Sequence, residues 1–252
     1  MSEPEAVNVN EDRYRPVLAA QSRGKTLRGI YERVYGADYP AEVEPFGFLS
    51  AAYLAMAARE LDGFGVRRLL DVGCGRGGPG LWVAREIGAA LVGIDIVAEA
   101  VTVARERAAV VGSAPDARFE VASATETGLP DGAFDGVVSF DALWMVIDKR
   151  AAFSEISRVL RPGSPLVFTT WEPAHLRHEW LLERAGFSSV TRHSLSGSLE
   201  RQLRVYEEIL GSRKEIAAEM GEAAAAVLVE EATLAPTTLQ TAPHVMIRAI
   251  RT

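Results

Sequence analysis

The stretch that decides the fold is LLDVGCGRGGPG, which runs from Leu69 to Gly80. It consists of a short apolar run, a group of glycines and the start of a helical pattern. Glycines lack a Cβ atom, so a ligand can lie against the backbone, and the first turn of a helix offers unpaired N–H groups. About 20 residues later a second apolar run ends in the carboxylate of Asp95, at the spacing expected for a group that binds ribose hydroxyls.

Apolar, β-branched runs alternate with helical patterns along the chain, which predicts an α/β fold with a mostly parallel sheet covered by helices on both faces. Seven strands are expected, at Arg68–Val72, Ala90–Asp95, Ala117–Ala122, Phe134–Phe140, Leu166–Trp171, Ser188–Ser194 and Val245–Arg251. Helices are expected between them, at Pro79–Ile87, Ala98–Val111, Arg150–Leu160 and Trp180–Ala185.

Two segments depart from this alternation, and we expect them to cover a single domain that spans residues 1–252. Residues 1–55 carry aromatic side chains among glycines and prolines, which predicts short helices and loops that form a lid. Residues 197–240 show helical spacing and should form a cap of two helices broken near Gly211. The cofactor-binding core is then expected at 65–195, and the last strand at 244–251.

Composition limits the class of protein and its partners. The 27 Lys and Arg against 34 Asp and Glu give a net charge of −7 without a basic stripe, which argues against nucleic acid as the main partner. Cys74 has no second cysteine to pair with, and Ser2–Asp12 is acidic where a secretory signal is basic and then apolar, so a cytoplasmic protein is expected. The apolar run Ala223–Val229 is too short to span a membrane, which takes about 20 residues.

The glycine pattern alone leaves two classes of cofactor open. Gly73, Gly75 and Gly78 also satisfy the G-x-G-x-x-G spacing of dinucleotide-binding proteins, so a Rossmann oxidoreductase that uses NAD(P) is an alternative.

Four further features together resemble the class I S-adenosylmethionine-dependent methyltransferases, over roughly residues 65–195 and the final strand. The first is Asp71, an acidic residue two positions before the first glycine. The others are the turn Gly128–Ser139 with its Phe134-Asp135 pair, the helix end Ile156–Gly163, and the run Leu182–Phe187. The resemblance implies a Rossmann-like sheet whose last strand is antiparallel.

The resemblance also implies a cofactor, S-adenosylmethionine, with S-adenosylhomocysteine as the product. The residues implied to bind it are Asp71, Gly73, Cys74, Gly75, Asp95, Ile96, Ser123, Ala124, Thr125, Phe140 and Tyr31. A helical insert before the last strand is similar to that of the branch that methylates sugars, sterols, tocopherols, glycine derivatives and natural products. The expected reaction is therefore methyl transfer to O, N or C of a small molecule in secondary metabolism, by a monomer or homodimer.

The chain departs from the family pattern at two places. Ser123 stands where relatives carry an acidic residue near the adenine, and the segment Asp141–Met145 stands where many relatives carry paired histidines. A histidine base at that position is therefore not assumed. A cofactor-binding protein with a non-methylating, cyclase-like role remains an alternative.

The candidate catalytic residues lie just after predicted strands, where open α/β sheets bind their ligands. Asp141 follows the fourth strand, although an aspartate there could instead cap a helix. His175 and His178 follow the fifth, and histidine suits acid and base chemistry. These two could also bind a metal, but no further ligands complete a set, so we expect no metal site. His193 and His244 are expected to be structural.

Aromatic side chains supply a candidate acceptor pocket. The residues proposed to line it are Tyr35, Phe46, Trp144 and Trp171. They could enclose an apolar acceptor or, with Tyr31, attract the sulfonium through cation–π contacts. Ordinary core packing is the alternative for each of them.

Overall fold

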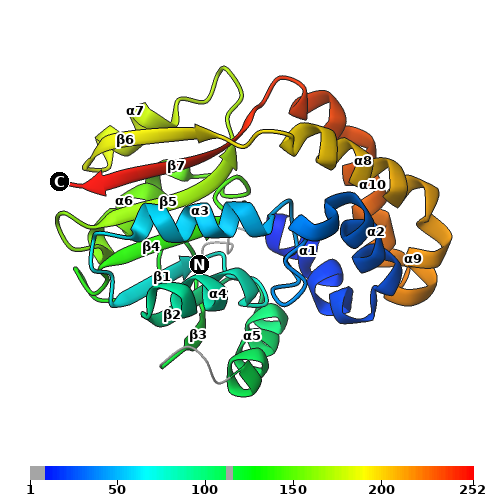
Figure 1. Ribbon diagram of the computed structural model, residues 1–252, viewed down its shortest axis with the longest axis horizontal. Helices are drawn as coiled ribbons and strands as arrows, with labels where there is room; N and C mark the ends of the chain where they lie inside the picture. The colour runs from blue at the N-terminus through cyan, green and yellow to red at the C-terminus, as the bar shows by residue number, and fades with distance from the viewer. Residues whose placement is uncertain (1–8, 112–115) are drawn as a thin grey trace, which may run out of the picture.

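The computed structural model describes residues 9–111 and 116–252 and contains one seven-stranded sheet (Figure 1). The strands are β1 (Arg68–Val72), β2 (Ala90–Asp95), β3 (Arg118–Val121), β4 (Gly136–Phe140), β5 (Pro165–Trp171), β6 (Phe187–Ser194) and β7 (His244–Arg251). Their order across the sheet is β3-β2-β1-β4-β5-β7-β6, and β7 is antiparallel to both neighbours while the other pairs are parallel. The predicted fold class and the seven predicted strands are confirmed.

The two faces of the sheet are covered by different helices, because successive side chains of a strand point to opposite sides. Leu69 packs on the side of α3 (Ala51–Leu61), α4 (Gly78–Ile87) and α5 (Ala98–Val111). Leu70 packs on the opposite side. The helices on that side are α6 (Lys149–Val159) and α7 (His178–Arg184). Burial on both faces explains why all seven residues of β5 are buried.

A third group of helices lies beside the sheet, at the right of Figure 1. It contains α1 (Val9–Ala20), α2 (Lys25–Tyr35), α8 (Ser198–Gly211), α9 (Arg213–Met220) and α10 (Glu222–Leu239), with the short 3-10 turns η1 (Gln21–Arg23) and η2 (Gly36–Asp38) near α2. The lid and cap segments thus form one unit with its own apolar core, which we call the helical layer. Glu231 of α10 links α1 and α8, since the carboxylate of Glu231 accepts hydrogen bonds from the hydroxyls of Tyr14 (2.9 Å) and Tyr206 (2.8 Å).

The cap contains three helices, so the prediction of two was wrong in number. The predicted break near Gly211 is present, because α8 ends there and α9 begins at Arg213. A second break follows Met220, at Gly221, whose φ of +91° lies outside the helical region and suits only glycine. Helical spacing of apolar residues continues across this glycine, which is why the pattern suggested one helix.

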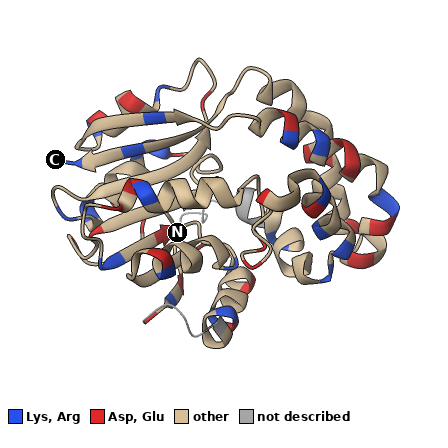
Figure 2. Ribbon diagram, viewed as in Figure 1, with Lys and Arg blue, Asp and Glu red and all other residues tan. Residues whose placement is uncertain are grey.

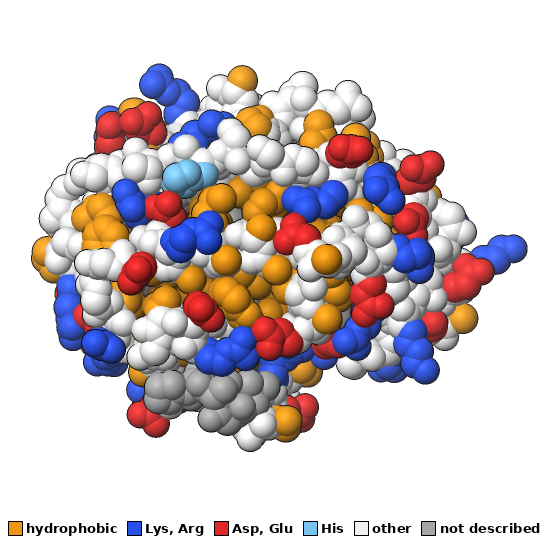
Figure 3. Space-filling model, viewed as in Figure 1, with side chains coloured by type: hydrophobic (Ala, Val, Ile, Leu, Met, Phe, Trp, Pro, Cys, Tyr) orange, Lys and Arg blue, Asp and Glu red, His pale blue; other side chains and the backbone are white. Residues whose placement is uncertain are grey.

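The surface mixes charge and apolar area. Acidic and basic side chains are interspersed on the helices (Figure 2), and hydrophobic side chains gather in the middle of the face over α3 and α4 (Figure 3). Among the helices of the described residues, none combines the length and apolar character that a membrane span needs.

Candidate active site

The loop between β1 and α4 forms a cradle of backbone. The N–H groups of Gly73 (2.8 Å) and Cys74 (2.9 Å) donate to the carbonyl of Ile94, which holds the loop against β2. Gly73 has φ of +72°, and a Cβ on it would lie only 2.2 Å from the Cβ of Ala142. A Cβ added to Gly75 would have no other atom of the described residues within 4 Å, so the space above this glycine is open to a ligand.

Two carboxylates flank this opening. Asp71 at β1 is only 1% exposed, and neither of its oxygens makes a hydrogen bond of normal geometry with the described residues. Burial, assisted by the nearby charge of Asp95 and opposed by the N–H of Gly80, raises the pKa of Asp71 to about 8. Asp95 at the end of β2 accepts the N–H groups of Gly75 (2.8 Å) and Val97 (2.9 Å). A buried carboxylate whose oxygens lack hydrogen bonds of normal geometry is the environment that an incoming ammonium group completes.

The close approach of α4 to Asp71 gives a testable packing constraint. A Cβ on Gly80 would lie 2.2 Å from Oδ2 of Asp71. We therefore expect Gly80→Ala to destabilise the protein by about 1–3 kcal/mol in chemical denaturation, because overpacking outweighs the better helix propensity of alanine.

The matched control is Gly29→Ala in α2, where the added Cβ meets only Nη1 of Arg33, at 3.2 Å. That variant should gain about 0.5–1 kcal/mol. Adding Asp71→Ala should remove most of the cost of Gly80→Ala. Strictly additive effects of these two substitutions would contradict the contact.

The residues predicted to surround the adenine lie at the same edge of the sheet. Asp95 pairs in register with Val121, so the segment that follows β3 emerges beside Asp95. There Ser123 and Thr125 form a turn, with their hydroxyl oxygens 2.8 Å apart and the N–H of Thr125 donating to Oγ of Ser123 at 3.2 Å. The structure therefore brings Ser123, Ala124 and Thr125 close to the strand end that carries Asp95.

The turn Gly128–Ser139, which contributed to the resemblance, is held by α6. Glu155 accepts the N–H (2.8 Å) and hydroxyl (2.6 Å) of Thr127, and Arg158 donates to Glu155 (2.7 Å) and also pairs with Asp131. The hydrogen bonds from Arg158 and Thr127 lower the pKa of Glu155 to about 2. These residues fix the path of the chain into β4.

Asp141 lies at the end of β4 in a left-handed backbone conformation, with φ of +56°. Its Oδ1 accepts hydrogen bonds from Oγ1 of Thr169 (2.7 Å) and pairs with Nε2 of His244 (2.8 Å), and its Oδ2 accepts the N–H of Phe48 (3.4 Å). Burial alone raises the pKa of Asp141, but these partners, His244 first, lower it overall. The alternative that Asp141 caps a helix is wrong, because Asp148 is the residue that caps α6.

The two histidines predicted to be catalytic lie elsewhere. His175 is exposed in the loop after β5. His178 begins α7 and is buried beside Phe153 and Phe168 on the α6 side of the sheet, with Nδ1 3.4 Å from Glu172. Burial lowers the pKa of His178. Neither is placed against Asp141.

The histidine that does contact Asp141 is His244, for which the sequence predicts a structural role. Because β7 runs antiparallel to β5, its first residue pairs with Trp171, the last residue of β5. His244 therefore lies at the carboxyl edge of the parallel strands. The antiparallel last strand implied by the resemblance was the signal that could have revealed this placement.

The predicted acceptor residues contribute to an aromatic cluster between the sheet and the helical layer. Its members are Tyr31, Tyr35, Phe48, Trp144, Trp171 and Tyr206. Phe48 is its centre, with ring centroids 5.3 Å from Tyr206, 6.1 Å from Trp171 and 6.3 Å from Tyr31. The hydroxyl of Tyr35 is buried without a hydrogen bond to any described residue. Phe48 and Tyr206 were missing from the predicted pocket because only the folded chain brings them together.

Phe46 lies slightly apart from this cluster. Its ring centroid is 5.8 Å from that of Tyr14, and with Tyr31 and Arg76 it lines a cavity of about 60 Å³ next to the glycine loop.

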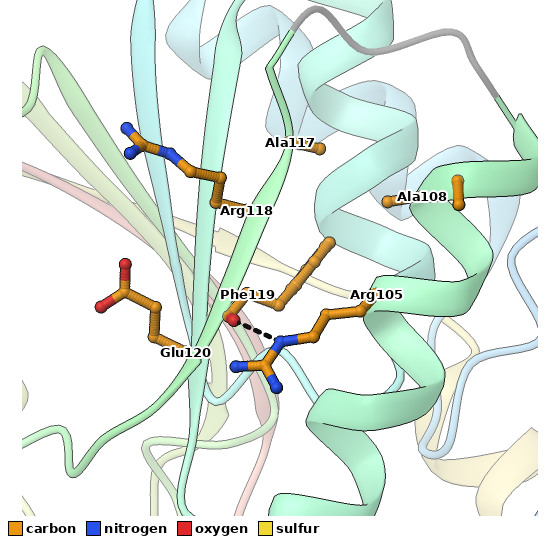
Figure 4. Close-up of a pocket in the computed structure, with 7 residues that line it drawn as sticks. Arg105, Ala108, Ala117, Arg118, Phe119 and Glu120 are labelled. Carbon is orange, nitrogen blue, oxygen red and sulfur yellow. Dashed lines mark hydrogen bonds between the residues drawn. The ribbon is translucent and has the colours of Figure 1, made fainter.

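A second cavity, of about 460 Å³, lies between α5 and β3, where Arg105 donates to the carbonyl of Phe119 at 2.9 Å (Figure 4). None of the predicted site residues lines this larger cavity.

Comparison with known families relates the fold and the glycine cradle to methyltransferase domains. Residues 70–168 match the family model described as a methyltransferase domain. In sequence, the chain is similar to phosphoethanolamine N-methyltransferase 3 of Arabidopsis thaliana, with 32% identity over 144 residues, which cover 56% of this chain and 27% of that protein. The chain thus spans about a quarter of that relative.

Two solved structures are similar over most of the chain. The [4+2]-cyclase SpnF has a TM-score of 0.66 and 26% identity, with coverage of 79% of this chain and 80% of that one. Phosphoethanolamine N-methyltransferase 2 of Haemonchus contortus, in complex with S-adenosyl-L-methionine, has a TM-score of 0.70 and 21% identity, with coverage of 99% and 61%. With the family match, these similarities favour the methyltransferase fold over the dinucleotide-binding interpretation of the glycines.

Proposed function

We propose that this protein transfers a methyl group from S-adenosylmethionine to an oxygen, nitrogen or carbon of a small molecule. The observation that carries the proposal is the pair of carboxylates, Asp71 and Asp95, that flanks the open backbone at Gly75. The pair lies at the carboxyl ends of adjacent parallel strands, which is where open α/β sheets bind their ligands.

The residues of the cradle fit the polar groups of this cofactor. The oxygens of Asp71 suit its ammonium group, Asp95 suits the two ribose hydroxyls, and Ser123 lies where the adenine would extend. Ile96, Ala124, Thr125, Cys74, Phe140 and Tyr31 are proposed to complete the binding site. When bound, the cofactor supplies a methyl group on a positively charged sulfur, which needs alignment more than activation.

The acceptor is proposed to bind in the aromatic cluster beyond β4 and β5. Aromatic rings such as Phe48, Trp144 and Trp171 exclude water and bind flat or apolar molecules. Asp141 supplies a charged group at the floor of this region, held by Thr169 and His244. The relative from Arabidopsis is named for an amine acceptor, which is consistent with a small-molecule substrate.

A thermal-shift comparison tests the cofactor. S-adenosylmethionine and S-adenosylhomocysteine at 100 times their Kd should stabilise the protein by about 2.7 kcal/mol, because they bind only the folded state. For a chain of this length that corresponds to roughly 5–10 °C in Tm. Stabilisation by nicotinamide dinucleotides, with no effect of either sulfur compound, would contradict the proposal.

Methyl transfer itself requires a second measurement. Incubation with cofactor labelled in the methyl group and a metabolite extract should produce a labelled small molecule. Cofactor binding without any labelled product would instead support the non-methylating role.

A further inference from the structure

Five side chains form a chain of hydrogen bonds whose direction can be assigned. The indole N–H of Trp171 can only donate, so the atom of Gln202 that it contacts at 3.0 Å is the amide oxygen. The NH2 of Gln202 then donates to Oγ of Ser198 at 2.5 Å. The hydroxyl of Ser198 lies 2.7 Å from Nδ1 of His244, and the NH2 of Gln202, which can only donate, lies 3.3 Å from the same nitrogen, so Nδ1 is the acceptor. The proton of the imidazole is therefore on Nε2, which donates to Oδ1 of Asp141 at 2.8 Å.

This chain is buried and immobilised by packing. The side chain of His244 is 2% exposed, and Gln202 and Ser198 are buried as well. The imidazole is stacked on the indole of Trp171, with centroids 4.5 Å apart and an angle of 12° between the rings, while Tyr53 meets it edge-on. Both ring nitrogens have partners, so His244 has no nitrogen left for a substrate.

The carboxylate of Asp141 is held asymmetrically. Oδ1 has two short hydrogen bonds, from Thr169 and His244. Among the described residues, Oδ2 accepts only the N–H of Phe48, at 3.4 Å, which is long for a hydrogen bond, and its neighbour Gly47 has no side chain, so that a Cβ added there would lie 3.4 Å from Oδ2. A non-glycine residue at φ of +56° costs of order 1 kcal/mol, and such strain is found where a site needs a particular orientation.

We propose, on the basis of the function proposed above, that His244 is a positioning residue for Asp141, and that the acceptor carries an O–H or N–H at the atom that is methylated. His244 and Thr169 fix Oδ1, and Oδ2 accepts the O–H or N–H of the acceptor in place of the N–H of Phe48. As the acceptor atom takes the methyl group, the bond between methyl and sulfur breaks and both electrons stay on sulfur. The proton of the acceptor passes to Oδ2 and then to solvent.

The helical layer takes part in positioning Asp141 through α8. Ser198 and Gln202 belong to α8, whereas Trp171 is the last residue of β5 and Asp141 directly follows β4. The tautomer of His244, and with it the orientation of Asp141, therefore depends on α8 being docked. A carbon acceptor lacks a hydrogen-bond donor for a buried carboxylate, which is why O–H or N–H acceptors are preferred here.

The first test observes the imidazole directly and needs no acceptor. The chain contains four histidines, so proton–nitrogen spectra of protein with labelled histidine can be assigned with single His→Gln variants. We expect these spectra to show the imidazole proton of His244 on Nε2, with Nδ1 as an acceptor. Because the hydroxyl of Ser198 and the NH2 of Gln202 both lie within reach of Nδ1, either single variant should keep this tautomer, whereas Ser198→Ala combined with Gln202→Leu should remove it. A proton on Nδ1, or on both nitrogens, in the unsubstituted protein would overturn the assignment.

The second test separates positioning from cofactor binding. His244→Ala should lower the rate of single-turnover methyl transfer by about 10–100-fold, because the carboxylate is no longer aligned. His244→Gln, which keeps a donor near the position of Nε2, should recover much of it. Both variants should keep the Kd for S-adenosylhomocysteine within about twofold. His193→Gln is the control, since His193 lies on β6, is partly exposed and pairs with Glu60 of α3 at 2.9 Å.

The outcomes distinguish the two proposals. If the unsubstituted protein fails to bind S-adenosylhomocysteine, the proposed function is wrong. The spectra of labelled histidine still test, independently of the cofactor, whether His244 donates to Asp141. If His244→Ala and His193→Gln react equally fast, the positioning role is wrong. A panel of phenols, amines and 1,3-dicarbonyl compounds tests the acceptor class, and transfer to carbon alone, or to none of them, would overturn that part.

Discussion

Replacing Asp95 by alanine is expected to lower the affinity for S-adenosylmethionine and S-adenosylhomocysteine by about 100-fold or more. A hydrogen bond from a hydroxyl to a carboxylate contributes about 1.5–3 kcal/mol, and the two ribose hydroxyls offer two of them. A loss of about 3 kcal/mol corresponds to slightly more than two factors of ten in Kd. Asp95 also holds the N–H groups of Gly75 and Val97, so the cradle loosens at the same time. Calorimetric titration measures the change.

Two controls make this result specific. Asp95→Asn keeps the size and one acceptor oxygen, so it should lose about 10-fold rather than 100-fold. Asp62→Ala removes an exposed aspartate whose carboxylate accepts the N–H of Gly63 at 3.1 Å, and it should bind normally. Unchanged affinity in Asp95→Ala would show that the cofactor, if it binds, does not use the carboxyl end of β2.

Asp71→Asn is expected to have two opposite effects. It should stabilise the cofactor-free protein by on the order of 2 kcal/mol near pH 8, because a buried charge without a partner is removed. It should also weaken binding of S-adenosylmethionine by at least about 10-fold, because the amide offers the ammonium group no charge. Urea denaturation and calorimetric titration measure these two quantities.

The stabilisation should depend on pH in a defined window. The ordinary pKa of 3.8 applies to Asp71 in the unfolded chain, and the folded value is about 8. Between these values the unfolded chain has released its proton while the folded protein retains it, so stability falls as pH rises and levels off above about 8. Asp71→Asn lacks this loss, so its advantage should grow across the window. A difference that is constant with pH would contradict the buried, unpaired state of Asp71.

The parts of the fold that sequence predicted well are those set by local pattern. The bounds of β1 and β2 were predicted to the residue, because each is an apolar run ended by a glycine or by Asp95. The second break in the cap was not, because Gly221 interrupts the helix without interrupting the apolar spacing. Local signals also placed Asp71 beside the glycine loop.

The parts of the site that sequence missed depend on sheet order. Whether His178 or His244 reaches Asp141 is decided by β7 lying between β5 and β6 and by α7 beginning at His178, neither of which a local pattern contains. The residue that caps α6 also could not be chosen from a local pattern. Both Asp141 and Asp148 precede α6, and only the length of the intervening loop shows that Asp148 is the cap.

Glu231 has a consequence for protein engineering. Because its carboxylate binds the phenols of both Tyr14 and Tyr206, the N-terminal helices and the later insert share one polar anchor in an apolar interface. A chimera that takes residues 198–242 from a relative and keeps its own first helices would mismatch this anchor. Acceptor specificity should therefore be transplanted by exchanging both segments together.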